Sequence, residues 1–139
     1  MTDIVSREIR SRMMSGIRSR DTRPEVRLRR ELHALGHRFR LHARDLAGTP
    51  DIVMPRRKAA IQVHGCFWHR HVGCKYTSTP ATRPDFWQAK FDSNRSRDAR
   101  NLAQLQCAGW RTAIVWECCL RGADISEVVR RLDTWLRSD

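Results

Sequence analysis

Apolar residues recur at helical spacing in three stretches of the sequence. Residues 22–36 start with Thr22 and Glu25, which have the spacing of a capping box that begins a helix. Residues 84–108 form a long polar stretch with a few aromatic and leucine positions, and residues 124–136 carry apolar side chains on one face. The pattern therefore predicts three helices. The apolar positions of the first are Val26, Leu28, Leu32 and Leu35.

Between these stretches the pattern changes to alternation and to short apolar runs, which are typical of strands. Residues 37–42 alternate polar with apolar positions, and residues 51–54 and 59–64 flank a turn, which predicts a β-hairpin. Residues 110–116 form an apolar run suited to a buried strand, whereas the longer segment 65–83 has little periodicity and reads as a loop. The order of elements indicates an α/β domain built around a small mixed sheet.

The net charge of the chain indicates what kind of molecule it binds. The chain has 139 residues, the length of one domain, with 27 Lys and Arg against 15 Asp and Glu, which gives a net charge of +12. Such an excess is typical of nucleic-acid-binding proteins, with a ribosome-associated protein as the alternative. No apolar run approaches the roughly 18–20 residues of a membrane span. The first residues show no secretory signal, so we expect a cytoplasmic protein.

The N-terminal segment differs from the rest of the chain. Residues 1–20 are basic and have few strong apolar positions, among them Met14 at helical spacing. We interpret residues 1–20 as a helical arm that orders on DNA, and residues 21–139 as the folded domain.

Three soft metal ligands lie within nine residues of the loop, at Cys66, His71 and Cys74. Cys118, at the end of the last strand, would complete a closed tetrahedral set that suits a structural zinc ion. Cys119 is equally available from its sequence position, and free core cysteines with a surface histidine are the alternative. The chain has five cysteines, and this odd number argues against a disulfide scaffold.

A second group of residues suggests hydrolysis. Asp51 begins one strand of the predicted hairpin, and Gln62 and His64 share a face of the other, so all three would meet at one end of the sheet. A carboxylate there suits Mg²⁺, which stabilises charge on a phosphodiester under attack. Glu25 would add an acidic or water-holding group, and either His64 or His69 could take a proton from water or donate one to a phosphate, unless the two histidines only make structural hydrogen bonds. Alternatively, Asp51 caps a turn and Glu25 belongs only to the capping box.

Aromatic side chains lie beside basic ones in the same region. Phe67 and Trp68 are in the loop, and Phe86 and Trp87 open the long helix next to Arg83. Such aromatic residues stack on bases or wedge between base pairs, although they could equally cover the loop as a small core. A zinc module that binds DNA without cutting it is therefore the alternative to a nuclease, and a nuclease could be of the restriction type that cuts both strands.

The motifs VHGCFWHRH at 63–71, PATR at 80–83, FW at 86–87 and WEC at 116–118 closely resemble the very short patch repair (Vsr) mismatch endonucleases. The resemblance extends over about residues 12–136. It implies a restriction-endonuclease-like fold of the PD-(D/E)xK type, with a small mixed sheet flanked by helices and a structural zinc site. It also implies nicking of one DNA strand on the 5′ side of the thymine in T·G mismatches, which arise by deamination of 5-methylcytosine.

The resemblance also implies roles for the candidate catalytic residues. Asp51 would hold the catalytic Mg²⁺ together with the backbone carbonyl of Val63. His64, His69 and Glu25 would position water or assist proton transfer, with His69 as the base. The zinc ligands would be Cys66, His71, Cys74 and Cys118.

For DNA, the resemblance implies insertion of Phe67, Trp68 and Trp87 beside the mismatch from the major groove and of Met14 from the minor groove. The remaining contacts to the mismatched pair or its neighbours would come from Lys90 and Asn94. It further suggests a monomer that is associated with the nucleoid and functionally coupled to a cytosine-5 DNA methyltransferase and to mismatch-repair proteins.

Three positions depart from the pattern. The superfamily strand ends in Glu-x-Lys, whereas this one reads Gln62-x-His64. Position 63 is Val where Thr is expected, which a ligand supplied by the backbone tolerates. The spacing between His71 and Cys74 is one residue longer than expected.

Overall fold

A four-stranded mixed sheet organises residues 22–138, the part of the chain that the computed structural model describes. The predicted arm at residues 1–20, with Met14, lies outside the described residues. The elements in chain order are α2 (Arg23–Ala34), β1 (Arg40–Leu41), β2 (Ile52–Met54), β3 (Ala59–His64), α3 (Cys66–His69), α4 (Pro84–Cys107), β4 (Arg111–Trp116) and α5 (Ser126–Arg137), with 3₁₀ turns at Pro55–Arg57 and Glu117–Leu120.

The strands lie in the order β1-β2-β3-β4. The predicted hairpin is confirmed, because β2 and β3 pair antiparallel, with Ile52 opposite Ile61. β3 and β4 pair in parallel along their whole length, from Ala59 opposite Arg111 to His64 opposite Trp116. The crossover between these two parallel strands contains α3 and α4. This register brings the end of β3 next to the end of β4.

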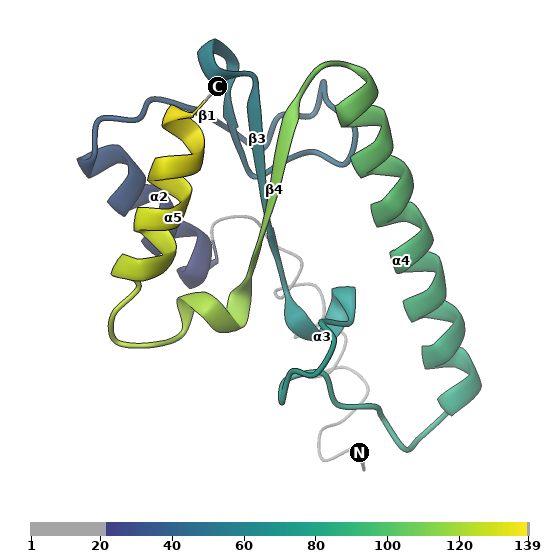
Figure 1. Ribbon diagram of the computed structural model, residues 1–139. Helices are drawn as coiled ribbons and strands as arrows, with labels where there is room; N and C mark the ends of the chain where they lie inside the picture. The colour runs from purple at the N-terminus through teal and green to yellow at the C-terminus, as the bar shows by residue number, and fades with distance from the viewer. Residues whose placement is uncertain (1–21, 139) are drawn as a thin grey trace.

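The helices lie on both faces of the sheet. Figure 1 shows α2 and α5 together on one side, α4 on the other, and α3 near the end of β3. The core lies between the sheet and the pair of helices α2 and α5. Its largest members are Leu28, Leu32, Ile52, Met54, Ile61, Leu120, Leu132 and Leu136.

The first helix begins as the sequence predicts. Thr22 is the N-cap, and its hydroxyl oxygen accepts a hydrogen bond from the backbone N–H of Glu25. Leu28 and Leu32 are fully buried, but Leu35 is the C-cap residue and is exposed. Gly36 then adopts a left-handed conformation, with a φ of 96°, as is typical of a residue that follows a helix.

Two strands and one loop differ from the prediction. The strand predicted over 37–42 is only two residues long, because His42 adopts a left-handed conformation that breaks the ladder. β4 is half-buried instead of buried, since it is an edge strand and has a neighbour on one side only. The segment predicted as a loop contains the short helix α3.

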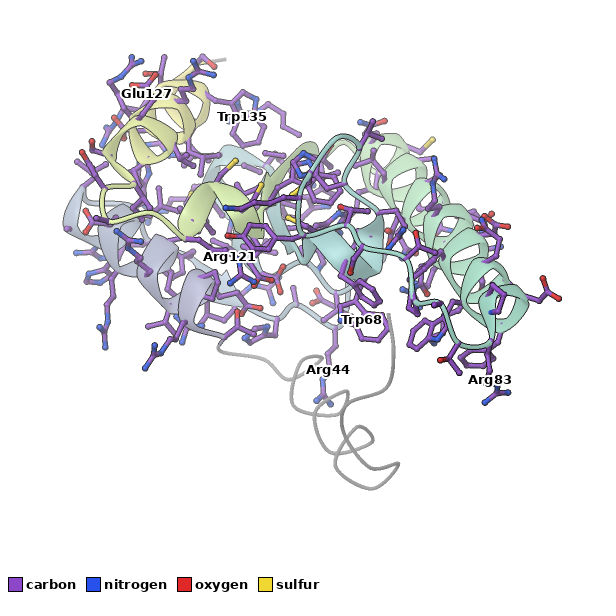
Figure 2. All side chains as sticks on the ribbon, turned by 90° about the horizontal axis from the view of Figure 1, so that it is seen from below. Arg44, Trp68, Arg83, Arg121, Glu127 and Trp135 are labelled. Carbon is purple, nitrogen blue, oxygen red and sulfur yellow. The ribbon has the colours of Figure 1, made fainter. Side chains whose placement is uncertain are left out.

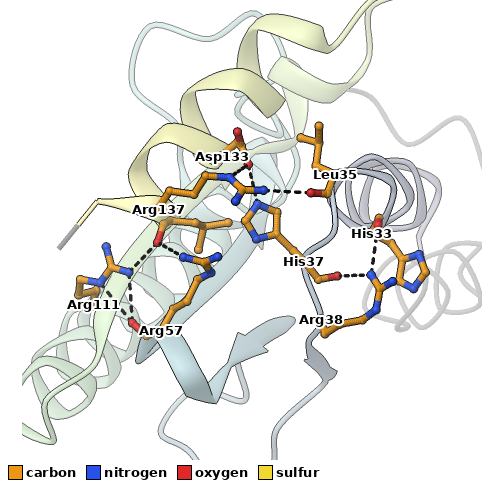
Figure 3. Close-up of polar contacts among 9 residues, drawn as sticks. His33, Leu35, His37, Arg38, Arg57, Arg111, Asp133 and Arg137 are labelled. Carbon is orange, nitrogen blue, oxygen red and sulfur yellow. Dashed lines mark hydrogen bonds and ion pairs between the residues drawn. The ribbon is translucent and has the colours of Figure 1, made fainter.

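Two arginines fix the C-terminal end of α5. Arg111 donates hydrogen bonds to the carbonyl oxygens of Trp135 (2.8 Å) and Leu136 (3.2 Å). Arg57 lies beside Arg111 in Figure 3 and donates to the carbonyl oxygen of Leu136 at 3.0 Å. Positive charge at this end of a helix is favourable, because the last carbonyls carry partial negative charge. The side chains thereby join α5 to the turn between β2 and β3 and to the start of β4.

A second polar contact joins the segment after α2 to α5. Nε2 of the buried His37 lies 2.7 Å from the carboxylate of Asp133, which Arg137 also contacts (Figure 3). Arg137, and then His37, hold the pKa of the Asp133 carboxyl below its usual value. Arg137 also donates to the carbonyl oxygen of Leu35, so the end of α5 is tied to the end of α2.

Replacement of Arg111 with alanine is expected to lower the free energy of unfolding by about 1–3 kcal/mol, because the carbonyl oxygens of Arg57, Trp135 and Leu136 each lose a charged donor. Urea unfolding followed by circular dichroism measures this. Arg130→Ala is the control, since Arg130 is exposed and pairs with Glu127 on its own helix. Equal stability of the two variants would contradict the anchoring role of Arg111.

Candidate active site

A cleft of about 360 Å³ opens between the ends of β2 and β3 and the side of α4. Residues from three segments of the sequence, 48–51, 62–69 and 97–101, line it, which is typical of a functional site. The lining residues are Gly48, Thr49, Asp51, Gln62, Val63, His64, His69, Arg97, Asp98 and Asn101.

Asp51 lies directly before β2, at one edge of the cleft. Its carboxylate accepts a hydrogen bond of 2.7 Å from the backbone N–H of Val63 on the paired strand. The structure thus brings Asp51 together with residues 62–64, as the hairpin predicts. Burial raises the pKa of the Asp51 carboxyl, while the hydrogen bonds with Val63 and with the Glu25 side chain act in the opposite direction.

Glu25 and His42 complete this corner of the cleft. Glu25, from the first turn of α2, is only 6% exposed. Nε2 of His42 lies 3.9 Å from the Glu25 carboxylate, and its Nδ1 lies 4.0 Å from the Asp51 carboxylate. One ligand atom from each of the three residues lies within 4.8 Å of the others. Glu25 is therefore more than a helix cap, and the sequence analysis missed His42 because no motif marks it.

Two stacked imidazoles form the wall of the cleft next to Asp51. The rings of His64 and His69 lie 3.8 Å apart and nearly parallel, and Nε2 of His64 lies 2.8 Å from Oε1 of Gln62. Burial, followed by electrostatic interactions with His69 and Arg97, lowers the pKa of His64 to about 4, although Asp98 opposes this shift. His64 is therefore neutral at pH 7.

Asp98 of α4 orients the second imidazole. Its carboxylate lies 2.5 Å from Nδ1 of His69, which leaves Nε2 of that ring for another partner. The sequence analysis missed Asp98. Its signal lies in the spacing of α4, where Asn94, Asp98 and Asn101 continue the helix face that Trp87 and Phe91 begin.

The four cysteine and histidine residues proposed as zinc ligands lie together. One ligand atom from each of the four lies within 4.8 Å of the others: Cys66, His71, Cys74 and Cys118. A zinc ion with ligands at about 2.3 Å holds tetrahedral sulfur atoms roughly 4 Å apart, so the donor set and its spacing fit this metal. Cys119 and Cys107 are exposed.

The thiols of this cluster differ in the direction in which their surroundings shift their pKa values. Burial is the main cause that raises the pKa of the Cys66 thiol. Burial is also the main cause that raises the pKa of the Cys118 thiol, to about 12. In contrast, a backbone hydrogen bond from Tyr76 lowers the pKa of Cys74. Thiolates confined in such a small volume repel each other, and a bound cation removes this cost.

The segment between the last two ligands of the loop turns outward. Val72 is 86% exposed, and Gly73 adopts a φ of 72°, which favours glycine. The longer spacing between His71 and Cys74 is accommodated in this way, and both side chains remain in the cluster. His71 also stacks on Trp116 of β4, with ring centres 4.2 Å apart.

Aromatic side chains gather where α3 meets α4. The ring of Phe67 lies 5.0–5.8 Å from those of Trp68, Trp87 and Phe91. Trp87 is 7% exposed, whereas Phe67 and Trp68 are half-buried. In Figure 2, Trp68 projects at the margin of the molecule, on the side that carries Arg44 and away from Glu127 and Trp135. Insertion of Trp87 into DNA would therefore require it to leave its packing in this cluster.

Asn94 and Lys90, the two polar residues predicted to contact the mismatch, differ in their exposure. Asn94 is buried, and its amide donates a hydrogen bond to the carbonyl oxygen of Trp68 at 3.3 Å. Asn94 thus holds α3 against α4, and its side chain faces the protein interior. Lys90, one turn earlier on α4, is half-exposed.

Within residues 22–138, the structure contains no helix with the length and apolar character that crossing a membrane requires.

Comparison with known proteins identifies the family. The model of the family "DNA mismatch endonuclease Vsr" matches residues 2–75. The chain is 49% identical to the type II nicking enzyme V.XorIIP of Xanthomonas oryzae pv. oryzae, over 95% of both chains. It is 41% identical to the DNA mismatch endonuclease Vsr of Escherichia coli K12, over 98% of this chain and 88% of the relative. The chain therefore belongs to the Vsr family of DNA endonucleases.

Proposed function

We propose that this protein is a Mg²⁺-dependent endonuclease that nicks one strand of double-stranded DNA on the 5′ side of the thymine in a T·G mismatch, and so initiates very short patch repair. One observation carries the proposal. The four residues of α3, Cys66–His69, connect three sites: the first belongs to the Cys/His cluster, the next two to the aromatic cluster, and the last to the cleft.

The corner formed by Glu25, His42 and Asp51 fits a divalent cation. Two carboxylates share this partly buried corner, and burial already raises the pKa of one of them, so a cation there would be stabilising. Asp51 and the backbone carbonyl of Val63 would hold Mg²⁺, which prefers oxygen ligands. When bound, the ion supplies positive charge that stabilises the phosphate under attack.

His69 is the proton acceptor in this account. Asp98 engages Nδ1 of the ring, which leaves Nε2 to take a proton from the attacking water. The imidazole of His64 stacks on His69 and fixes its plane. The pairing of an imidazole with this half-buried carboxylate keeps the base in one tautomer and orientation.

The aromatic cluster would select the mismatch. A T·G wobble pair is easier to unstack than a Watson–Crick pair, so a wedge discriminates by deformability. Stacking of Phe67 and Trp68 on bases contributes about 1–3 kcal/mol per base. The adjacent position of His69 on α3 would then place the reaction next to the distorted pair.

The Cys/His cluster would bind a structural zinc ion that holds the start of α3 to the end of β4. The four ligands come from α3, the segment after it, and the turn after β4. A site with four protein ligands has no open coordination position, so its role is structural.

Labelled duplexes with one T·G pair or none, incubated with the purified protein, test the proposed function. We expect a single nick 5′ of the mismatched thymine that requires Mg²⁺. Cleavage of both strands of matched DNA would indicate a restriction-type nuclease. Binding to the duplex without any cleavage would indicate a zinc-containing DNA-binding module.

Asp98→Asn is expected to lower the single-turnover nicking rate by about 10²-fold, because His69 loses the anion that orients it. The amide preserves the size of the side chain, so the thermal midpoint should hardly change. An unchanged rate would exclude Asp98 as the positioning residue for His69.

Trp68→Ala is expected to slow nicking of T·G duplexes by about 10-fold or more, which corresponds to the loss of one stacked base. Trp68→Phe, which keeps an aromatic ring, should restore most of the rate. The measurement is single-turnover nicking at several protein concentrations. If Trp68→Ala is as active as the wild type, the aromatic cluster does not select the mismatch.

A further inference from the structure

The catalytic cleft contains one cationic side chain that the proposed mechanism does not use. We propose that Arg97 of α4 binds a non-bridging oxygen of the phosphate that is cut, and so positions this phosphate between Asp51 and His69. The inference rests on the proposed function, because it assigns a phosphate-binding residue to the same cleft.

The charged side chains of the cleft indicate why a phosphate needs Arg97. Among the described residues that line it, Asp51 and Asp98 carry carboxylates, and Arg97 has the one permanent positive charge. His64 does not replace it, because burial lowers the pKa of this imidazole to about 4 and leaves it neutral at pH 7. A phosphodiester that enters between two carboxylates is repelled by both, and a guanidinium in the same wall offsets that repulsion.

The availability of the guanidinium is the second step. Arg97 is exposed, and the structure gives it no hydrogen bond or ion pair within residues 22–138. Many other arginines do have such partners: Arg57 and Arg111 contact carbonyl oxygens, and Arg137 contacts Asp133. The fork of donors on Arg97 is therefore free for a ligand, and two parallel hydrogen bonds to phosphate oxygens suit its shape.

The position on α4 is the third step. Arg97 directly precedes Asp98, whose carboxylate contacts the proposed base His69, and all three residues line the cleft. The segment at Gly48 closes the cleft beside α4, because a Cβ at Gly48 would lie 3.0 Å from the Asn101 side chain. A phosphate that enters the cleft next to His69 therefore meets Arg97 in the same lining.

The test compares single-turnover nicking of a T·G duplex by three variants. We expect about 10²-fold slower nicking for Arg97→Gln, the usual effect of removing one donor to a charged reacting group. Arg97→Lys should recover part of this loss, because it keeps the charge and loses the fork. Arg100→Gln, the matched control, removes an exposed arginine of the same helix outside the cleft lining and should stay within about threefold of the wild type.

A second measurement identifies the phosphate. Duplexes that carry one neutral methylphosphonate at a time are titrated with protein in buffer without magnesium. Neutralising the phosphate at the nick position should weaken binding of the wild type by about 10-fold and that of Arg97→Gln by less than about twofold, while other positions affect both proteins equally. Equal losses at the nick position, or nicking by Arg97→Gln as fast as by Arg100→Gln, would overturn the assignment. Failure of the wild type to nick any T·G duplex would instead overturn the proposed function.

Discussion

Replacement of Asp51 with asparagine is expected to lower the nicking rate by about 10³-fold or more and to leave binding to a T·G duplex intact. The amide oxygen can still accept the hydrogen bond from the Val63 N–H, so the local backbone is preserved. The negative charge that would hold the divalent ion is lost, and stabilisation of the phosphate by the ion is worth several kcal/mol. The rate is measured under single-turnover conditions and the binding by fluorescence anisotropy.

Asp45→Asn is the matched control for this variant. Asp45 lies in the segment just before Asp51, its side chain is 64% exposed, and its carboxylate lies 3.5 Å from the Arg40 guanidinium. The Asp45→Asn variant therefore removes the same negative charge, but outside the cleft. Its nicking rate should remain within about twofold of the wild type, because exposed pairs contribute little. If Asp51→Asn nicks within tenfold of the control in Mg²⁺, another residue holds the ion.

Replacement of Cys66 with serine is expected to release zinc and to lower the free energy of unfolding by about 3 kcal/mol or more. Cys66 is buried at the centre of the cluster, where its Sγ also accepts a hydrogen bond from the backbone N–H of Cys118. Loss of one ligand opens the site, and metal binding of this kind contributes directly to folding. Elemental analysis gives the zinc content, and urea unfolding gives the stability.

Other cysteines serve as controls for the zinc assignment. Cys107 lies at the end of α4 and is exposed, so Cys107→Ser should keep both zinc and stability. Cys118→Ser should release zinc and Cys119→Ser should not, because the Cys118 sulfur belongs to the cluster, 3.5 Å from Nδ1 of His71, whereas Cys119 is exposed and is not a member of it. Full zinc content in Cys66→Ser would refute the ligand set.

Local patterns in the sequence predict much of the fold. The hairpin follows from two short β-rich runs around a turn, and α4 follows from a long stretch bounded by Pro84 and Gly109. The number of residues in β1 and the exposure of β4 could not be predicted, because both depend on neighbouring strands. Edge and central strands have similar sequences, and only the assembled sheet distinguishes them.

Some residues of the candidate site could be predicted from local sequence patterns, and others could not. Asp51 and the cysteine cluster were predictable, because a strand pairing and a short spacing bring their members together. Asp98 and Arg97 were not, since α4 reaches the cleft only through the crossover between β3 and β4. His42 was also missed, because its approach to Glu25 depends on how α2 packs beside the sheet.

The short helix α3 connects the cysteine cluster to the cleft. A helix of four residues has little stability of its own, so its position depends on what holds its two ends. Cys66 belongs to the cysteine cluster at one end, and His69 contacts Asp98 at the other. We infer that zinc removal affects catalysis through the orientation of His69 as well as through stability.

The ratio of two nicking rates tests the central claim most directly. Two duplexes that differ only in one base, T·G against T·A, are labelled on the thymine strand and incubated with excess wild-type protein and Mg²⁺. The account predicts that the T·G duplex is nicked at least about 10²-fold faster, because only the weakened pair yields to Phe67 and Trp68. Equal rates on the two duplexes would contradict it, since the cleft would then cut DNA without selecting the mismatch.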